Sequence, residues 1–267
     1  MILRFSIRLL GLSGRTRWSN EFLQQLNPHI EVHVDGERYV FHTGNGRLLW
    51  RAKTFATEEP LIFEWIKRFK PGDVVLDIGA NAGLYSVAFA KRGALVYACE
   101  LDPLNAAEIR RNAHLNGVAD RVIVLPVACG SQDGVQEVFF RDLSPGDALQ
   151  SMGRPTPRNT RLGKDPYTAP TLVLSLDQLW VRANLPAPNH IKIDVDGNEK
   201  EVAGGILELC STASTIYVED EGEADTATFL ERLYAYGFVE RAAMSISVGT
   251  APSTSGHRGS NRILERR

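Results

Sequence analysis

Residues 77–83 read DIGANAG at the end of a short apolar run, residues 74–78, and a segment with helical character follows at residues 84–91. A cofactor that crosses the carboxyl edge of a parallel sheet must approach the backbone closely there, which glycine permits. A nicotinamide fingerprint would read G-x-G-x-x-G and direct a pyrophosphate at the helix N-terminus. Because the second glycine is missing and Asp77 precedes the loop, the loop suits a cofactor with a cationic amino-acid end better than a pyrophosphate.

An acid at the end of the next expected strand strengthens this interpretation. Residues 95–100 read LVYACE, so Glu100 follows the loop by about 20 residues. A carboxylate in that position accepts hydrogen bonds from both hydroxyls of a ribose. The order of strand, D-x-G-x-N-x-G, helix, strand and acid therefore predicts a nucleoside cofactor. The alternative is a tight turn between a strand and a helix with an acidic cap.

Strand-like and helix-like segments alternate from residue 71 onward, which predicts an α/β fold with a doubly wound, mostly parallel sheet and helices on both faces. The third strand is expected at 122–128, and its end, Val127 and Ala128, is a candidate wall for an adenine ring. Further strands are expected at 134–140, 172–174, 191–195 and 216–219, near Ile246 and at 262–264, and further helices at 103–116, up to about Cys210 and at 229–236.

One α/β domain with an N-terminal extension is expected, since the chain is rather short for two full domains. Residues 1–70 read as an N-terminal extension of a hairpin and helices packed on the core, and residues 71–267 as the cofactor-binding domain. A long loop at 141–170 interrupts the second part. Its basic residues, Arg154, Arg158, Arg161 and Lys164, suit an acidic glycan or a phosphate, with an ordinary solvated loop as the alternative.

Composition narrows the class of protein. The chain has 267 residues and a formal net charge of -2, without the basic excess that nucleic-acid binding usually needs. Its three cysteines lack metal-ligand spacing, which fits a reducing cytoplasm.

Residues 1–12 are too short and too interrupted by arginine for a secretory or membrane-spanning segment. They are expected to form a helix packed on the domain, with weak contact to a membrane surface as the alternative; no oligomeric state is predicted.

Several motifs in the same order resemble the FkbM family of methyltransferases over roughly residues 40–265. The resemblance implies a Rossmann-like, seven-stranded sheet of the class I methyltransferase type, with S-adenosylmethionine as methyl donor. It also implies O-methylation of a hydroxyl on a sugar, a glycan or a natural product. The motifs are PGDVVLDIGANAGLYS at 71–86, NAHLNG at 112–117, VACG at 127–130, DG at 133–134, SLDQL at 175–179 and IKIDVDGNE at 191–199. The upstream Glu59-Pro60 and Trp65-Ile66 also resemble a branch of that family.

The resemblance carries cofactor roles to individual positions of this chain. One departure matters, because the family usually shows D-V-E-G and this chain has Asp194-Val195-Asp196-Gly197, with a shorter acid at Asp196. Together with the reasoning above, the predicted cofactor site consists of Asp77, Gly79, Ala80, Asn81, Gly83, Glu100, Leu101, Ala128 and Asp194.

Methyl transfer from a sulfonium needs alignment of the reactants and exclusion of water, and a hydroxyl acceptor also needs a proton acceptor. Asp194 is expected nearest the reacting centre, either as the base or against the methionine part of the cofactor. Glu199 is the second candidate, with an N-terminal capping box as its structural alternative. His190 is a further candidate base. No protein metal site is expected, although Mg²⁺ held by the acids near Asp194 and Glu219 is a secondary alternative.

Other functions share parts of this pattern. A nicotinamide oxidoreductase shares the fold but not the loop. A base N-methyltransferase shares the cofactor, but its N-P-P-Y or D-P-P-Y motif is missing after the expected strand at 191–195. A ribose or other nucleic-acid methyltransferase, and a non-catalytic cofactor-binding protein of the same fold, remain as alternatives. A small-molecule or glycan acceptor is favoured over nucleic acid.

Overall fold

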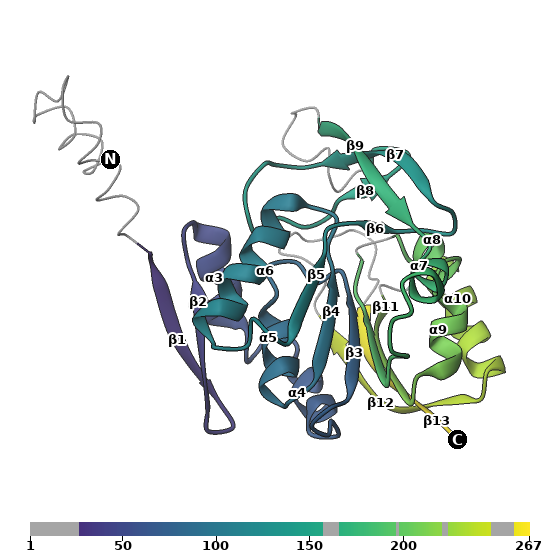
Figure 1. The fold of residues 1–267 in the computed structure, drawn as a ribbon, viewed down its shortest axis with the longest axis horizontal. Coiled ribbons are helices and arrows are strands. Elements are labelled where there is room, and N and C mark those ends of the chain that lie inside the picture. Colours follow the sequence, from purple (N-terminus) through teal and green to yellow (C-terminus); the bar gives the residue numbers. More distant parts are fainter. Residues whose placement is uncertain (1–26, 157–165, 196–197, 221–223, 247–258) are drawn as a thin grey trace, which may run out of the picture.

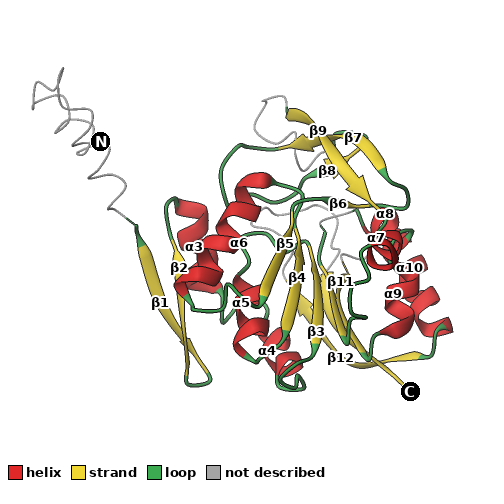
Figure 2. Cartoon of the chain, viewed as in Figure 1, coloured by secondary structure: helices red, strands yellow, loops and turns green. Residues whose placement is uncertain are grey.

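A seven-stranded sheet forms the centre of the fold, with helices on both faces (Figure 1, Figure 2). The structure is a computed structural model that describes residues 27–156, 166–195, 198–220, 224–246 and 259–267. The strands lie in the order β12 (Phe238–Ile246), β13 (Gly259–Arg266), β11 (Thr215–Asp220), β10 (His190–Ile193), β3 (Val74–Ile78), β4 (Leu95–Cys99) and β5 (Val122–Leu125). Every pair from β11 to β5 is parallel, and β13 runs antiparallel to both of its neighbours. The predicted mostly parallel, Rossmann-like sheet is confirmed.

The direction in which the chain adds strands reverses at β3. The chain runs from β3 to β4 and β5 on one side, and later returns to place β10 on the other side of β3. In open α/β sheets such a reversal leaves a crevice at the carboxyl ends of the two central strands. The glycine loop follows β3 and Asp194 follows β10, so the topology brings both to this crevice.

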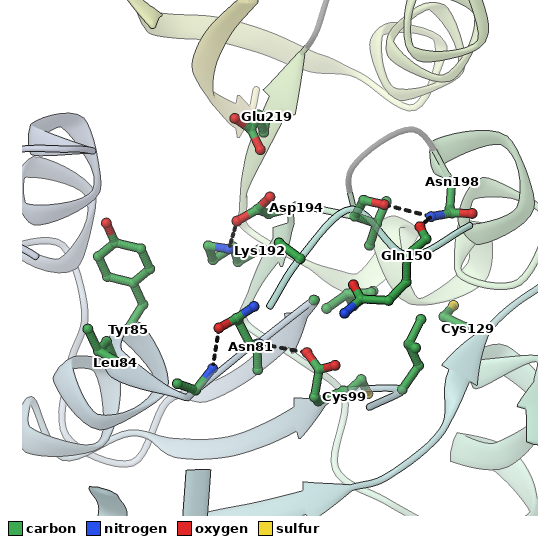
Figure 3. Close-up of a pocket in the computed structure, with 18 of the residues that line it drawn as sticks. Asn81, Leu84, Tyr85, Cys99, Cys129, Gln150, Lys192, Asp194, Asn198 and Glu219 are labelled. Atoms are coloured by element: carbon green, nitrogen blue, oxygen red, sulfur yellow. Dashed lines mark hydrogen bonds and ion pairs between the residues drawn. The ribbon is translucent and has the colours of Figure 1, made fainter. Parts of the chain in front are cut away.

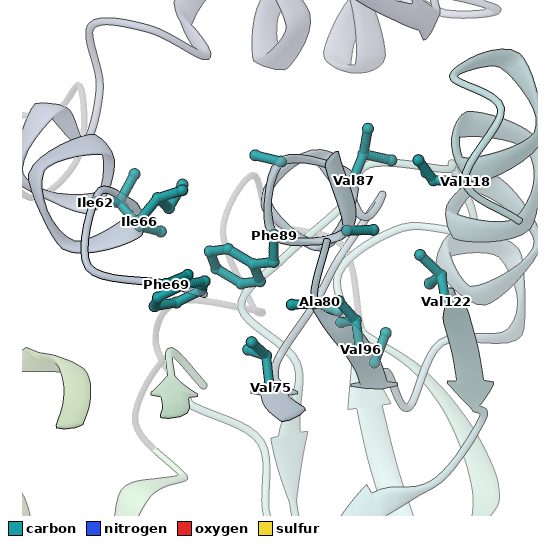
Figure 4. Close-up of a cluster of buried hydrophobic side chains, with 14 of the residues drawn as sticks. Ile62, Ile66, Phe69, Val75, Ala80, Val87, Phe89, Val96, Val118 and Val122 are labelled. Carbon is teal, nitrogen blue, oxygen red and sulfur yellow. The ribbon is translucent and has the colours of Figure 1, made fainter. Parts of the chain in front are cut away.

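Two hydrophobic cores cover the two faces of the sheet. The alternation of side chains along β3 sends Val75 into one core and Leu76 and Ile78 into the other. Figure 4 shows Val75 with Phe69 and Phe89 in the first core. The first core packs α3 (Gly46–Thr54), α4 (Pro60–Ile66), α5 (Leu84–Lys91) and α6 (Pro103–Leu115), and the second packs α7 (Leu176–Arg182), α8 (Glu199–Ala203), α9 (Leu207–Thr212) and α10 (Ala224–Ala235).

An N-terminal hairpin lies against α6. Its strands, β1 (His29–Val34) and β2 (Glu37–His42), are joined at Asp35 and Gly36. Asn112 of α6 and Asn116 at its C-cap accept hydrogen bonds from the β2 backbone: Asn112 Oδ1 from His42 N and Asn116 Oδ1 from Val40 N, both at 2.9 Å. These side-chain contacts fix the hairpin, and through it α3, beside the main sheet.

A second sheet of four strands lies over the carboxyl edge of the first (Figure 1). The third strand, expected at 122–128, ends at Leu125, because Pro126 has no N–H for the ladder. The following Ala128 and Cys129 form β6 in the second sheet. The strands of this second sheet lie in the order β6 (Ala128–Cys129), β9 (Tyr167–Leu174), β7 (Gly134–Phe140) and β8 (Ser151–Met152). The loop expected at 141–170 therefore contains β8 and the start of β9.

The single helix expected to reach about Cys210 is two helices, α8 and α9. Gly204 and Gly205 separate them, and a Cβ on Gly205 would lie 2.0 Å from the Gly130 carbonyl oxygen. This close approach to the second sheet explains the break. The helix expected at 229–236 begins earlier, at Ala224. Residues 1–12, and residues 247–258 between the last two strands, lie outside the described residues.

Candidate functional site

A cavity of about 250 Å³ opens at the carboxyl ends of β3, β4, β10 and β11. Part of its wall comes from the glycine loop and the ends of β4 and β5, and part from the segment around α3 and α4. We call these the glycine-loop wall and the N-terminal wall. The glycine-loop wall consists of Ile78, Gly79, Ala80, Asn81, Ala82, Cys99, Glu100, Leu101, Val127, Ala128 and Cys129, and the N-terminal wall of Trp50, Arg51, Phe55, Glu58 and Glu59.

The glycines of the loop each meet a different neighbour. Gly79 has φ +80°, and a Cβ there would lie 1.7 Å from the Asp194 carbonyl oxygen, so the loop packs directly on the end of β10. A Cβ on Gly83, at φ +77°, would lie 2.8 Å from Ile109, so this glycine allows α5 to pack on α6. Gly79 N and Ala80 N both donate to the Cys99 carbonyl, at 3.0 and 3.1 Å. Only Gly79 of these two glycines lines the cavity.

Glu100 is held from two sides. Its Oε2 accepts a hydrogen bond from Asn81 N at 2.7 Å, and its Oε1 accepts one from Asp102 N at 2.8 Å. Burial raises the pKa of Glu100 to about 7, against these backbone N–H groups, which lower it. Asp102, two residues after Glu100, caps α6: its side chain accepts a hydrogen bond from Leu104 N at 2.8 Å.

A buried lysine with acidic neighbours forms the floor between the two walls. Lys192 is 1% exposed, and its Nζ lies 2.7 Å from Asp194 Oδ2 and 3.9 Å from Asp77 Oδ1. Asp77 is fully buried: its Oδ2 accepts a hydrogen bond from Ser86 Oγ at 2.5 Å, and its Oδ1 has no hydrogen-bond partner among the described residues. Figure 3 shows Lys192 bonded to Asp194, with Glu219 beside them.

Burial and the neighbouring charges shift the pKa values of Asp77, Asp194 and Lys192. Burial raises the pKa of Asp77, and Lys192 opposes the rise. Burial would also raise the pKa of Asp194, but the Lys192 charge and hydrogen bonds from Glu219 and Lys192 lower it to about 2. Burial opposes the charge of Lys192, yet the surrounding acids raise its pKa above the usual value. Asp194 is therefore a weak proton acceptor.

The N-terminal wall was not predicted from the sequence. Glu59 Oε2 accepts a hydrogen bond from the Tyr217 hydroxyl at 3.1 Å and one from Asn261 Nδ2 at 3.5 Å. Tyr85 and Trp50 also line the cavity, and Trp50 is 49% exposed. The Thr57-Glu58-Glu59-Pro60 sequence signals the start of α4, but no local pattern indicates that Glu59 turns toward the end of β10.

The opposite side of the cavity belongs to the second sheet and the chain around it. The Asp147 carbonyl accepts hydrogen bonds from Asn81 Nδ2 at 2.8 Å and Asn105 Nδ2 at 3.0 Å, which ties residues 145–150 to the glycine loop. Asn198 Nδ2 donates to the Gln150 carbonyl at 2.9 Å. In Figure 3 Gln150 and Asn198 lie across the cavity from Tyr85.

The structure brings most of the sequence-predicted site residues to this cavity. Asp77 and Gly83 lie behind the wall rather than on it, and Glu199 is buried at the start of α8, outside the cavity lining among the described residues. His190 lies at the other end of β10, bonded to Thr215 and Asp73. Those that line the cavity are Gly79, Ala80, Asn81, Glu100, Leu101, Ala128 and Asp194.

Two further expectations bear on metals and membranes. The described residues contain no group of three or more His, Cys, Asp or Glu side chains placed to hold a metal ion, so the Mg²⁺ alternative gains no support there; Asp196 lies outside them. Among the helices that the structure describes, none is long and apolar enough to cross a membrane. The loop residues Arg158, Arg161 and Lys164 also lie outside the described parts of the chain.

Comparison with known proteins gives a family match over most of the sheet. Residues 77–239 match the methyltransferase FkbM domain, which is more than half of the chain. The hexuronic acid methyltransferase AglP of Haloferax volcanii is 24% identical over 194 residues, which cover 72% of this chain and 74% of that protein.

Other similarities are shorter or more distant. A ribosomal protein L11 methyltransferase of Nitratiruptor sp. is 44% identical over 55 residues, and the matched part spans 21% of this chain and only 20% of that relative. A solved structure from Streptococcus mutans, whose description proposes a SAM-dependent methyltransferase, superposes with a TM-score of 0.52 at 12% identity, over 89% of this chain and 55% of the other. This last similarity concerns the fold alone.

Proposed function

Because the chain belongs to the FkbM family of S-adenosylmethionine-dependent methyltransferases, we propose that it transfers the methyl group to a hydroxyl oxygen of a sugar, a glycan or a natural product. The observation that carries the proposal is the cavity itself, in which the glycine-loop wall faces a polar N-terminal wall across the Lys192 and Asp194 pair. One wall suits the methyl donor and the other suits a hydroxylated acceptor.

The glycine-loop wall fits S-adenosylmethionine by the chemistry of its groups. The two backbone N–H groups that anchor Glu100 bond to different oxygens, and a carboxylate has further lone pairs that can accept from ribose hydroxyls. Gly79, Ala80 and Asn81 would lie along the cofactor, and Leu101 and Ala128 would flank the adenine. Gly83 contributes by seating α5 on α6.

The floor of the cavity fits the cationic end of the donor. Lys192 faces the two carboxylates of Asp77 and Asp194, and one oxygen of Asp77 lacks a hydrogen-bond partner among the described residues. The excess of negative charge favours a sulfonium and an ammonium group. We assign Asp194 to this end of the cofactor, because a carboxyl with a pKa of about 2 takes up protons poorly at neutral pH.

The N-terminal wall supports a hydroxylated acceptor. Its acids, Glu58 and Glu59, accept hydrogen bonds from hydroxyl groups, and the exposed indole of Trp50 offers a flat apolar face to a sugar ring. The similarity to a hexuronic acid methyltransferase extends over 72% of the chain and supports a sugar as the acceptor. We propose a supporting role for Glu199 behind the cavity. We also propose a cytoplasmic location for the protein.

When bound, S-adenosylmethionine supplies an activated methyl group on a sulfonium. The chain's own task is to align the acceptor oxygen with that methyl group and to exclude water. The backbone contact between Gly79 and Asp194 fixes the two loops on either side of the reacting centre. Residues 145–150 cover the glycine loop through the Asp147 carbonyl.

The test is label transfer from tritiated S-adenosylmethionine to a panel of acceptors. The panel contains neutral hexosides, hexuronides, total tRNA and ribosomal protein, each incubated with the purified chain. Transfer to a hexoside or a hexuronide is expected. Calorimetric titration with S-adenosylhomocysteine and with NADH accompanies it, and binding of S-adenosylhomocysteine alone is expected. Label in tRNA or ribosomal protein only would overturn the proposed acceptor class, and binding of NADH alone would overturn the cofactor.

A further inference from the structure

We propose that Glu59 is the general base of the reaction and takes the proton of the acceptor hydroxyl. The inference rests on the proposed O-methylation and names the residue that makes the hydroxyl oxygen nucleophilic. Glu59 belongs to the N-terminal wall and precedes the part of the chain matched by the family domain, residues 77–239.

The position of Glu59 in its helix is the first argument. Glu59 occupies the N-cap position of α4, where a short polar side chain such as Ser, Asp or Asn commonly accepts a hydrogen bond from the first turn. Its side chain forms no such bond and lines the cavity instead. The first turn of α4 begins with Pro60, which has no N–H to satisfy. The local structure therefore leaves the carboxyl group free for another task.

The anchoring of the carboxyl group is the second argument. Both hydrogen bonds that the described residues give to Glu59, from Tyr217 on β11 and Asn261 on β13, end on Oε2. Tyr217 is fully buried and Asn261 is 1% exposed, so two rigid donors hold one oxygen. Oε1 is left for a ligand in the cavity. A base held by one oxygen and open at the other suits proton transfer at a fixed position.

The charges around Glu59 are the third argument. Burial raises the pKa of Glu59 to about 7, Lys192 lowers it, and Asp194 raises it. A carboxyl that ionises near neutral pH is well matched to general base catalysis. The titratable and charged groups facing it are Glu58 beside it, Arg51 from α3, Tyr85 from α5, Lys192 and Asp194 from β10 and its end, and Tyr217 and Glu219 from β11.

Three other candidate bases, Asp194, Glu100 and His190, are engaged elsewhere. Asp194 is paired with Lys192 at 2.7 Å. Glu100 holds two backbone N–H groups of the glycine-loop side. His190 lies at the far end of β10, where Asp73 and Thr215 bond to its ring.

The acceptor, the methyl donor and Glu59 account for all the bonds, electron pairs and protons of the proposed step. The new C–O bond uses an electron pair of the hydroxyl oxygen, and the electron pair of the broken C–S bond stays on sulfur in S-adenosylhomocysteine. The O–H electron pair remains on oxygen as the proton passes to Glu59. The neutral carboxyl then loses that proton to water after the product leaves. No oxidant, reductant or further reactant is needed.

The test compares Glu59→Gln with Glu64→Gln. Glutamine keeps the shape and can still accept from Tyr217, while Glu64 lies on the same helix with its side chain 64% exposed and serves as the matched control. With the acceptor found in the label-transfer panel, Glu59→Gln should lower kcat by about a hundredfold or more. Binding of S-adenosylhomocysteine should be unchanged in both variants, and Glu64→Gln should turn over normally.

The pH dependence separates Glu59 from Glu100, whose pKa is also about 7. At saturating donor and acceptor, wild-type kcat should fall as the pH drops below neutral, because Glu59 becomes protonated, and this limb should vanish in Glu59→Gln. Protonation of Glu100 should appear in donor affinity instead. Infrared difference spectra of the S-adenosylhomocysteine complex across neutral pH should show a carboxylic acid band that Glu59→Gln lacks.

The outcomes distinguish this inference from the proposed function. If no acceptor of the panel is methylated by the wild-type chain, the proposed function fails and the inference fails with it. If the wild type methylates an acceptor and Glu59→Gln does so at the same kcat, only the role of Glu59 is overturned. Absence of the titrating infrared band from the wild type would overturn it as well.

Discussion

The two walls of the cavity are held in different ways. The backbone contacts inside the glycine-loop wall are short-range: Asn81 N bonds to Glu100, 19 residues away, and Gly79 N bonds to Cys99. Longer-range contacts with Asp147 and Asp194 then pack the loop against other elements. The N-terminal wall is held by long-range side-chain contacts, since Glu59 bonds to Tyr217 and Asn261, at separations of 158 and 202 residues. One unit of strand, loop, helix and strand thus places the glycine loop beside Glu100, whereas the position of Glu59 depends on β11 and β13, which lie far away in the sequence.

This difference implies that a substitution in one wall can alter the binding of one ligand without altering the binding of the other. The glycine-loop wall lies within the matched family domain at 77–239, and the N-terminal wall, residues 50–59, precedes it. We therefore expect substitutions in the first wall to change donor affinity and substitutions in the second to change acceptor use. The predictions below test that separation.

The largest effect is expected at the floor that both walls share. Lys192→Met should lower the free energy of unfolding by about 3–5 kcal/mol, because Asp77 and Asp194 would be left close together without their cation. Urea denaturation measures it, with Lys91→Met as control, since Lys91 pairs with Glu37 at the surface and should cost at most about 1 kcal/mol. The loss should shrink at acid pH, where the two carboxyls become neutral. Equal stability of Lys192→Met and wild type would contradict the role of this lysine.

A smaller effect, confined to the donor side, is expected at the glycine loop. Gly79→Ala should cost about 2–4 kcal/mol and abolish binding of S-adenosylhomocysteine, because the positive φ is strained and the new Cβ would overlap the Asp194 carbonyl. Gly36→Ala is the control: it has a similar φ of +81° but nothing within 4 Å, so strain alone should cost about 1–2 kcal/mol. Calorimetry and urea denaturation measure both. Tight binding by Gly79→Ala would refute the contact.

The next effect concerns Glu100. Glu100→Ala should weaken S-adenosylhomocysteine binding by about 1–3 kcal/mol through lost ribose hydrogen bonds. Since burial raises the pKa of Glu100 to about 7, wild-type affinity should fall below neutral pH, by at most about tenfold per pH unit. The sign follows because ribose donors favour the carboxylate, so binding releases a proton. Calorimetry at several pH values measures it, and a pH-dependent affinity in the alanine variant would count against Glu100.

The smallest effect is expected at Trp50. Trp50→Ala should raise the acceptor KM by about threefold to tenfold, through loss of an aromatic contact, and leave donor affinity unchanged. Steady-state kinetics with the acceptor identified by label transfer measures the first quantity, and calorimetry the second. Because Trp50 is 49% exposed, stability should change little. A loss of donor affinity would break the separation of the two walls.

The same contrast explains what the sequence could predict. The glycine loop and Glu100 lie in consecutive elements, so their spacing was sufficient to predict a shared site. The proximity of Lys192 to Asp77, by contrast, depends on the register in which the two residues face each other across β10 and β3. The contact of Glu59 with Tyr217 depends on how α4 packs on β11, and no local sequence pattern predicts that packing. The early end of the third strand did have a local signal, Pro126.

The row that Asp77, Lys192 and Tyr217 form across three strands has a consequence for how the chain folds. A slip of one residue between β10 and β3 would turn Lys192 to the opposite face of the sheet. It would then lie in the core formed by Leu76, Ile78 and their neighbours, without an acid to pair with. We expect such a misaligned state to be strongly disfavoured. We therefore expect the lysine between the two walls of the cavity to favour the native alignment of β10 and β3 during folding, before any ligand binds.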